Sequence, residues 1–257
     1  MRKMPFLLSL IVTFLLTSVS AEGRTKRNIL YAITSSHTPP LAYISYENYT
    51  NPTVEKGILL EIGVELLKEI GFTTTTVTIP KKRLTQAFKT KKVQMICHMN
   101  ESWQSLKTDV LWSTDLYRNR DVIVTLEKTE IHKLEGKTIG TLVNYRYPKL
   151  ESYFERHFVI REDAPTTQSN LLKLLNRRID YAIMTDIEYN YFKIRHPKIS
   201  KLNFDLGEVR AKCVISKDAG IPISNLNAAI DKFKRSGRFE TIINSYNLRT
   251  KVPDAGT

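Results

Sequence analysis

Apolar and polar residues alternate along this chain with two different periods, which predicts helices and strands in turn. Segment 57–71 carries apolar residues at the spacing of one helix face and ends on Gly71, a usual helix terminator. A second long helical pattern occupies 224–247 and is interrupted at Gly237. Runs rich in β-branched and apolar residues predict strands at 28–34, 72–79, 121–127 and 137–143. We therefore expect a mixed α/β protein.

Two segments of the chain repeat one plan. Residues 84–101 (LTQAFKTKKVQMICHMNE) and 171–188 (LLKLLNRRIDYAIMTDIE) each begin with an amphipathic helix that ends in a pair of Lys or Arg residues. An apolar strand follows at once, and polar residues mark its carboxyl end, with Asn100 and Asp186 at matching places. Two copies of one unit within alternating strands and helices predict two α/β lobes of related topology.

The first 21 residues have the pattern of a secretory signal peptide. Arg2 and Lys3 precede a nearly continuous apolar run at 6–16, and residues 19–21 (Val-Ser-Ala) supply the small-residue pattern that signal peptidase cleaves. The apolar run is too short to span a membrane comfortably. We expect cleavage after residue 21 and therefore a soluble chain exported to the periplasm.

The formal net charge of +13 does not by itself identify a partner. A basic surplus is compatible with nucleic acid, anionic membranes or acidic ligands. The Lys and Arg residues are spread along the chain, however, without a long basic tail or a nucleic-acid-binding motif. We interpret them mainly as solvated surface and expect no nucleic-acid partner.

The two cysteines, Cys97 and Cys213, both lie in apolar runs, which favours two buried thiols. Export also permits a disulfide, which would require their two strands to lie side by side. The five histidines are scattered, and no C-x-x-C, H-E-x-x-H or mixed Cys/His spacing occurs. We therefore expect no metal and no cofactor.

Asp186 stands between the apolar run 179–184 and a second helix-like stretch. One interpretation is that it caps this helix. The other is that it contacts a ligand, because ligands of open α/β sheets bind at the carboxyl ends of strands. Segments 37–40, 98–103 and 144–146 stand at similar strand ends, so two facing lobes would bring them to one cleft.

Several segments match, in order, the motifs of one known family. YAITSSHTPPLAY (31–43) is similar to its first strand and Pro-Pro-aromatic loop, with Leu rather than an aromatic residue after the prolines. WSTDLYRNRDVIV (112–124) is similar to its Ser-x-Pro-Tyr-Tyr segment, with Asp replacing Pro. LEGKTIGTLVN (134–144), LLNRRIDYAIMTD (174–186) and FKRSGRFETIINSYN (233–247) are similar to its later motifs. The chain thus resembles the periplasmic solute-binding proteins of the polar amino-acid type, bacterial extracellular solute-binding protein family 3.

The resemblance implies a two-lobed Venus-flytrap fold, the type II periplasmic-binding-protein architecture, with two crossover hinge strands. Lobe 1 would comprise residues 28–120 and 213–250 and lobe 2 residues 124–210, with hinges near 121–124 and 212–214. A ligand would bind between the lobes and close them. The implied partners are a small polar, amino-acid-like solute and the membrane permease of an ABC-type importer, and we expect a monomer.

The resemblance also implies site residues. Asp186 matches the acid that receives a ligand's amino group through a charge-assisted hydrogen bond. The family's Arg, which holds a carboxylate in a bidentate fork, is missing. Lys107 is the nearest cation, and Arg146 either reaches in from the other lobe or lies on the surface. The other candidates, chosen by position, are Trp103, Tyr145, Glu101, Arg83 and Tyr43.

Two other functions stay open at this point. The resemblance fits equally well a ligand-sensing partner of a membrane signalling protein, which binds without transport. Some family relatives are dehydratases, and an enzyme would use titratable groups such as Glu101, His98 and Asp186. These residues show no recognisable catalytic spacing, so we expect no enzyme. The altered anchors leave open whether the ligand is an amino acid held differently, a cationic amine or a small polar anion.

Overall fold

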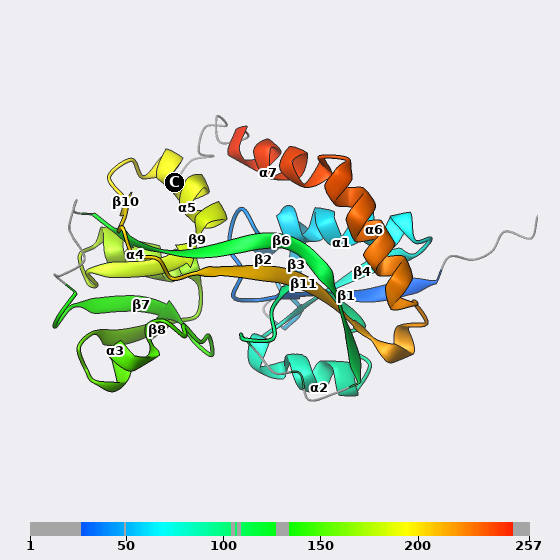
Figure 1. The fold of residues 1–257 in the computed structure, drawn as a ribbon, viewed down its shortest axis with the longest axis horizontal. Coiled ribbons are helices and arrows are strands. Elements are labelled where there is room, and N and C mark those ends of the chain that lie inside the picture. Colours follow the sequence, from blue (N-terminus) through cyan, green and yellow to red (C-terminus); the bar gives the residue numbers. More distant parts are fainter. Residues whose placement is uncertain (1–26, 49, 104–105, 107–108, 127–133, 249–257) are drawn as a thin grey trace, which may run out of the picture.

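The computed structural model describes residues 27–48, 50–103, 106, 109–126 and 134–248. Two lobes are joined by two long strands that run side by side from one lobe into the other (Figure 1). These strands, β6 (Val110–Thr125) and β11 (Glu208–Ser216), are antiparallel and pair over most of their lengths. The predicted pair of crossover strands is therefore confirmed.

The first lobe contains the strand order β4-β1-β5-β11-β6. Strand β1 is parallel to both β4 and β5, so the carboxyl ends of these three strands meet at one edge. The strands specific to this lobe are β1 (Asn28–Thr34), β2 (Tyr43–Ser45), β3 (Thr53–Lys56), β4 (Thr73–Ile79) and β5 (Met95–Met99). Its helices are α1 (Ile58–Glu69), η1 (Lys81–Arg83), α2 (Leu84–Lys89), η3 (Lys217–Ala219), α6 (Ile223–Arg235) and α7 (Arg238–Leu248).

The second lobe continues the sheet in the order β6-β9-β7-β8, and a short strand, β10, also pairs with β6. Its strands are β7 (Thr138–Leu142), β8 (Ile160–Ala164), β9 (Tyr181–Thr185) and β10 (Ser200–Lys201). Its helices are α3 (Glu151–Glu155), α4 (Thr167–Leu175) and α5 (Asp186–Arg195). The helix–strand repeat seen in the sequence corresponds to α2–β5 in one lobe and α4–β9 in the other.

The packing of α1 shows how the apolar pattern produces the first lobe. The helix buries Leu59, Ile62 and Leu66, the residues whose spacing predicted it. Gly63 lies on the same buried side, where a Cβ atom would come within 2.4 Å of the Tyr31 ring. The hydroxyl of Tyr31 in turn donates a hydrogen bond to the carbonyl of Leu59 at 2.9 Å. Helix α1 is thus fixed against the centre of the sheet.

The helix predicted at 224–247 and the strand predicted at 121–127 can both be compared with the structure. The long helical pattern at 224–247 forms α6 and α7, which are separated at Gly237 (φ 66°), a backbone conformation that glycine adopts without strain. The strand predicted at 121–127 begins earlier, at Val110, because β6 pairs first with β11 and then with β9. This change of partner falls between Arg120 and Asp121. The full lobe boundaries given above stay a prediction.

The structure corrects the expectation of two buried thiols. Cys97 in β5 and Cys213 in β11 form a disulfide, with their Cα atoms 3.9 Å apart. The two strands are neighbours in the sheet, which places the two buried side chains together. The bond therefore joins a central strand of the first lobe to one of the two strands that cross between lobes.

Within the part of the chain that the structure describes, no helix is both long enough and apolar enough to cross a membrane.

Candidate ligand-binding site

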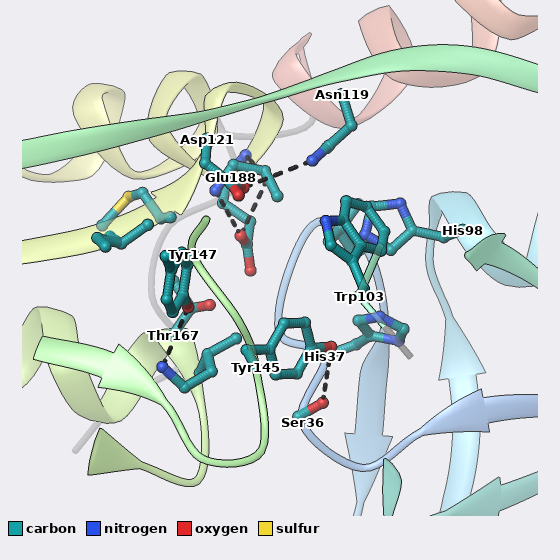
Figure 2. Close-up of a pocket in the computed structure, with 15 residues that line it drawn as sticks. Ser36, His37, His98, Trp103, Asn119, Asp121, Tyr145, Tyr147, Thr167 and Glu188 are labelled. Carbon is teal, nitrogen blue, oxygen red and sulfur yellow. Dashed lines mark hydrogen bonds between the residues drawn. The ribbon is translucent and has the colours of Figure 1, made fainter. Parts of the chain in front are cut away.

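A cavity lined by aromatic, polar and aliphatic side chains lies between the two lobes, beside the crossover strand β6 (Figure 2). The lining residues come from three sources: strand ends and the loops after them in lobe 1, strand ends, loops and helix starts in lobe 2, and the crossover strand β6. They are Ser36, His37, Leu41, His98, Trp103, Asn119, Asp121, Leu142, Tyr145, Tyr147, Thr167, Ile183, Met184, Thr185 and Glu188. The strand ends that the sequence marked with polar residues therefore do meet at one place.

The lobe 1 wall of the cavity consists mainly of ring side chains. His37 follows β1, and His98 lies near the end of the neighbouring strand β5, so the parallel pairing of these strands brings them together. The His98 ring centroid lies 5.4 Å from that of His37 and 5.2 Å from that of Trp103. Burial lowers the pKa of His98 to about 4 and that of His37 well below its usual value. Both imidazoles are therefore neutral at pH 7.

The lobe 2 wall is organised by the start of α5. Thr185 is the N-cap: its hydroxyl accepts a hydrogen bond from the backbone N–H of Glu188 at 3.1 Å. Oε2 of Glu188 accepts in return from the backbone N–H of Thr185 at 3.0 Å, which completes a capping box. This arrangement fixes the Glu188 carboxylate, and its other oxygen, Oε1, accepts a hydrogen bond from the hydroxyl of Thr38 in lobe 1.

Asn119 and Asp121 enter the cavity from β6, where that strand passes between the lobes. Burial and the nearby carboxylate of Glu188 raise the pKa of Asp121 from 3.8 to about 7. The amide of Asn119 donates weakly to Asp121, at 3.5 Å. Its Oδ1 is buried and has no hydrogen-bond partner among the described residues. A donor on a bound molecule or a water would satisfy this acceptor.

The two lobes touch one another directly around the cavity. Besides the bond between Thr38 and Glu188, the Tyr43 hydroxyl donates to that of Tyr191 at 2.9 Å. The hydroxyl of Tyr145 lies 3.4 Å from that of Ser36. The structure therefore represents a conformation in which the lobes are closed on one another.

Of the residues proposed from sequence, Trp103 and Tyr145 line this cavity. Tyr43 is not among the lining residues but joins the lobes through Tyr191. Arg146 and Arg83 are exposed and do not line it. Glu101 is also exposed, and it forms an ion pair with Lys212 at 3.0 Å. Lys107 lies outside the described residues.

Asp186 is the first residue of α5, and it is not among the residues that line the cavity. The interpretation of Asp186 as the N-cap is wrong, because Thr185 caps the helix. Partial burial raises the pKa of Asp186, while Lys201, Arg120 and backbone N–H groups oppose that change. Its role as an ammonium anchor stays a prediction.

Asp121, Asn119, Glu188, Tyr147 and Thr167 line the cavity but were not proposed as site residues. A local signal existed for Glu188, since Thr185 and Glu188 have the spacing of a capping box. No local signal distinguished Asp121 and Asn119 from the charged and polar residues beside them. Among the described residues, no group of three His, Cys, Asp or Glu side chains is arranged to hold a metal ion.

Comparison with known proteins supports the resemblance seen in the sequence. No protein-family model matches the chain. A curated protein of Escherichia coli (strain K12), whose name assigns it provisionally to arginine binding for an ABC transporter, is 24% identical over 249 residues. The match covers 93% of this chain and 96% of that protein.

Solved structures agree on the architecture. An arginine-specific periplasmic binding protein of Salmonella typhimurium superimposes with a TM-score of 0.66 at 16% identity, over 85% of this chain and 98% of that one. The VFT2 domain of BvgS from Bordetella pertussis superimposes with a TM-score of 0.65 at 17% identity, over 85% and 93%. The chain therefore has the two-lobed α/β fold of periplasmic solute-binding proteins.

Proposed function

We propose that this protein is a receptor, exported to the periplasm, that captures a small polar, amino-acid-like solute between its two lobes. The observation that carries the proposal is the composition of the cavity. Ser36, His37 and Trp103 from lobe 1 face Tyr145 and Glu188 from lobe 2 across one space. A solute held there would contact both lobes at once and would therefore favour the closed form.

The aromatic and acidic groups of the cavity suit a solute that has both a flat or apolar part and hydrogen-bond donors. Trp103 and Tyr145 offer ring faces, which pack against apolar groups and against cations. Glu188, Asp121 and the unpartnered Oδ1 of Asn119 are acceptors. An ammonium or guanidinium group of the solute would satisfy Oδ1 of Asn119 and would add to the hydrogen bonds that Glu188 already accepts.

Delivery to an ABC-type importer is the partner function we propose first, because the curated E. coli relative is named for that role. A sensory role is the second candidate, because the BvgS VFT2 domain superimposes on the chain. Recovery of an ABC-type permease in a pull-down from solubilised membranes would support the first role. Binding instead to the outer domain of a membrane kinase would support the second.

Catalysis is not part of the proposal. The relatives compared above are named or titled as binding proteins or as a Venus-flytrap domain. Of the three titratable residues considered for an enzyme, His98 lines the cavity, whereas Glu101 is exposed and Asp186 is not among the lining residues. A dehydratase would release water from a bound hydroxy or ring acid, and turnover of such a compound would contradict a purely binding role.

A thermal-shift screen with amino acids, polyamines and small carboxylates tests the receptor function. A solute that binds the folded state adds about 2.7 kcal/mol at one hundred times its Kd. For a chain of this size that corresponds to a rise in Tm of roughly 5–10 °C. We expect at least one compound of the panel to produce such a rise. No shift with any compound at millimolar concentration would contradict the proposal.

A further inference from the structure

Lys81 is a buried lysine at the junction between the lobes. It belongs to η1, the short turn that precedes α2 in lobe 1, and its side chain is 8% exposed. Its Nζ lies 3.1 Å from the centroid of the Tyr145 ring, which belongs to lobe 2 and lines the cavity. A lysine that crosses from one lobe to an aromatic ring of the other is placed to respond to whatever enters between them.

The burial of Lys81 contrasts with the cations that follow it. Lys82 and Arg83 continue the same turn but are exposed. Lysine is almost never buried without a compensating interaction, because the ammonium loses its hydration. Burial lowers the pKa of the Lys81 ammonium from 10.5 to about 7, although the negative charge of Asp121 acts in the opposite direction. The contact with the Tyr145 ring offsets part of the cost of burying Lys81, whereas Lys82 stays in solvent.

The titratable groups near Lys81 lie on two opposite sides of the cavity. In lobe 1, Lys81 acts electrostatically on His37 and His98, and both imidazoles are neutral at pH 7. Asp121 and Glu188 stand on the other side, at the hinge and in lobe 2. Lobe 1 thus contributes a basic group and the opposite side contributes acidic groups, which is the arrangement that the two ends of a zwitterion require.

We infer that Lys81 is the residue that receives the anionic group of the solute, in place of the arginine that the sequence lacks. The inference rests on the proposed function and adds to it that the solute carries a carboxylate or another small anion beside its hydrogen-bond donors. Lys81 does not itself line the cavity, but it is buried against the ring of Tyr145, which does. Two other cations considered for this role, Arg146 and Arg83, are exposed. A charge-assisted hydrogen bond to Lys81 would replace its contact with the Tyr145 ring.

Pairs of compounds that differ by one carboxylate test this role by isothermal titration calorimetry. The probes are arginine and agmatine, ornithine and putrescine, lysine and cadaverine, and glutamate and 4-aminobutyrate. We expect the native protein to bind at least one amino acid of these pairs tenfold or more tighter than its decarboxylated partner, a difference of about 1.4 kcal/mol. In Lys81→Met we expect the ratio of the two affinities to fall close to one. Removing the ammonium should weaken binding of the amino acid and leave binding of the amine unchanged.

Lys82→Met is the matched control, because it removes the same charge one residue away on the exposed surface. Lys81→Arg retains a cation and should preserve part of the ratio. The Tm of Lys81→Met should equal or exceed that of the native protein, since a buried Met has no charge to desolvate. An unchanged Tm separates a loss of binding from a loss of folding.

The possible results distinguish this inference from the proposed function. If Lys81→Met keeps the native ratio, or if the native protein binds only the amines, Lys81 is not the anion anchor, whereas the receptor function stands. If Lys81→Met instead binds the amines more tightly, Lys81 merely competes with a cationic solute, and the inference fails. If the native protein binds none of these compounds and no other amino acid, the proposed function itself is wrong.

Discussion

The hydroxyl of Thr38 in lobe 1 donates a hydrogen bond to Oε1 of Glu188 in lobe 2, at a distance of 3.1 Å. Both side chains are buried, and the acceptor is the same carboxylate that completes the capping box at the start of α5. The contact therefore links lobe closure to the local structure at the start of a helix.

Removing the Thr38 hydroxyl should favour the open form of the ligand-free protein. Thr38→Val keeps the shape of the side chain but removes a hydrogen bond to a charged group, worth about 1.5–3 kcal/mol. We expect a larger radius of gyration in small-angle X-ray scattering. Thr53→Val, at an exposed position in β3, is the control and should leave the scattering unchanged. Identical curves for Thr38→Val and the native protein would show that this bond does not hold the lobes together.

The carboxylates of Glu188 and Asp186 are both candidates for the group that binds the cationic end of the solute, and substitutions can distinguish between them. Glu188→Gln should weaken solute binding at least tenfold, because Glu188 lines the cavity. Asp186→Asn should weaken the binding of a cationic solute, with folding nearly intact, if Asp186 has the role that the family resemblance implies. Calorimetry on both variants decides between the residues. Because Glu188 also belongs to a capping box, the Tm of its variant must be measured alongside.

The carboxyl of Asp121 should make stability depend on pH. Its pKa is raised from 3.8 to about 7, so the folded state holds this proton more tightly than the unfolded state. The contribution of Asp121 to stability is therefore full below about pH 4 and is lost as pH rises through 7. The ionised carboxylate then costs on the order of a few kcal/mol relative to its exposed state.

Asp121→Asn removes this dependence. We expect the Tm of the variant, relative to the native protein, to be higher at pH 8 than at pH 4. Lys81 acts on Asp121 electrostatically, so the comparison should be repeated in the Lys81→Met background. A difference in Tm that is the same at both pH values would contradict the raised pKa.

The disulfide between Cys97 and Cys213 should contribute substantially to stability, because it closes a loop across 116 positions of sequence. Loss of a native disulfide usually costs about 2–5 kcal/mol. We expect dithiothreitol to lower the Tm of the native protein by several degrees. The double variant Cys97→Ala, Cys213→Ala should start at the lower Tm and should not respond to the reductant. A native Tm that is insensitive to complete reduction would contradict the prediction.

Much of the fold could be predicted because helices and strands leave local periodic patterns. The buried face of α1, the strand β1 and the interruption at Gly237 all depend on residues a few positions apart. The repeated helix–strand unit predicted two lobes, and the order of motifs predicted their architecture. Trp103 and Tyr145 could be proposed because each lies in the segment that follows a predicted strand, β5 or β7, and both line the cavity.

The tertiary structure alone decided which residues face the cavity. Lys81, Lys82 and Arg83 are consecutive cations, and only the orientation of their turn against lobe 2 buries the first and exposes the others. Asp121 meets Glu188 because β6 pairs with β9 at the hinge. Cys97 meets Cys213 because β5 and β11 are neighbours. Sequence periodicity reports on contacts within a few residues, whereas these three arrangements depend on sheet order and lobe closure between segments far apart in the chain.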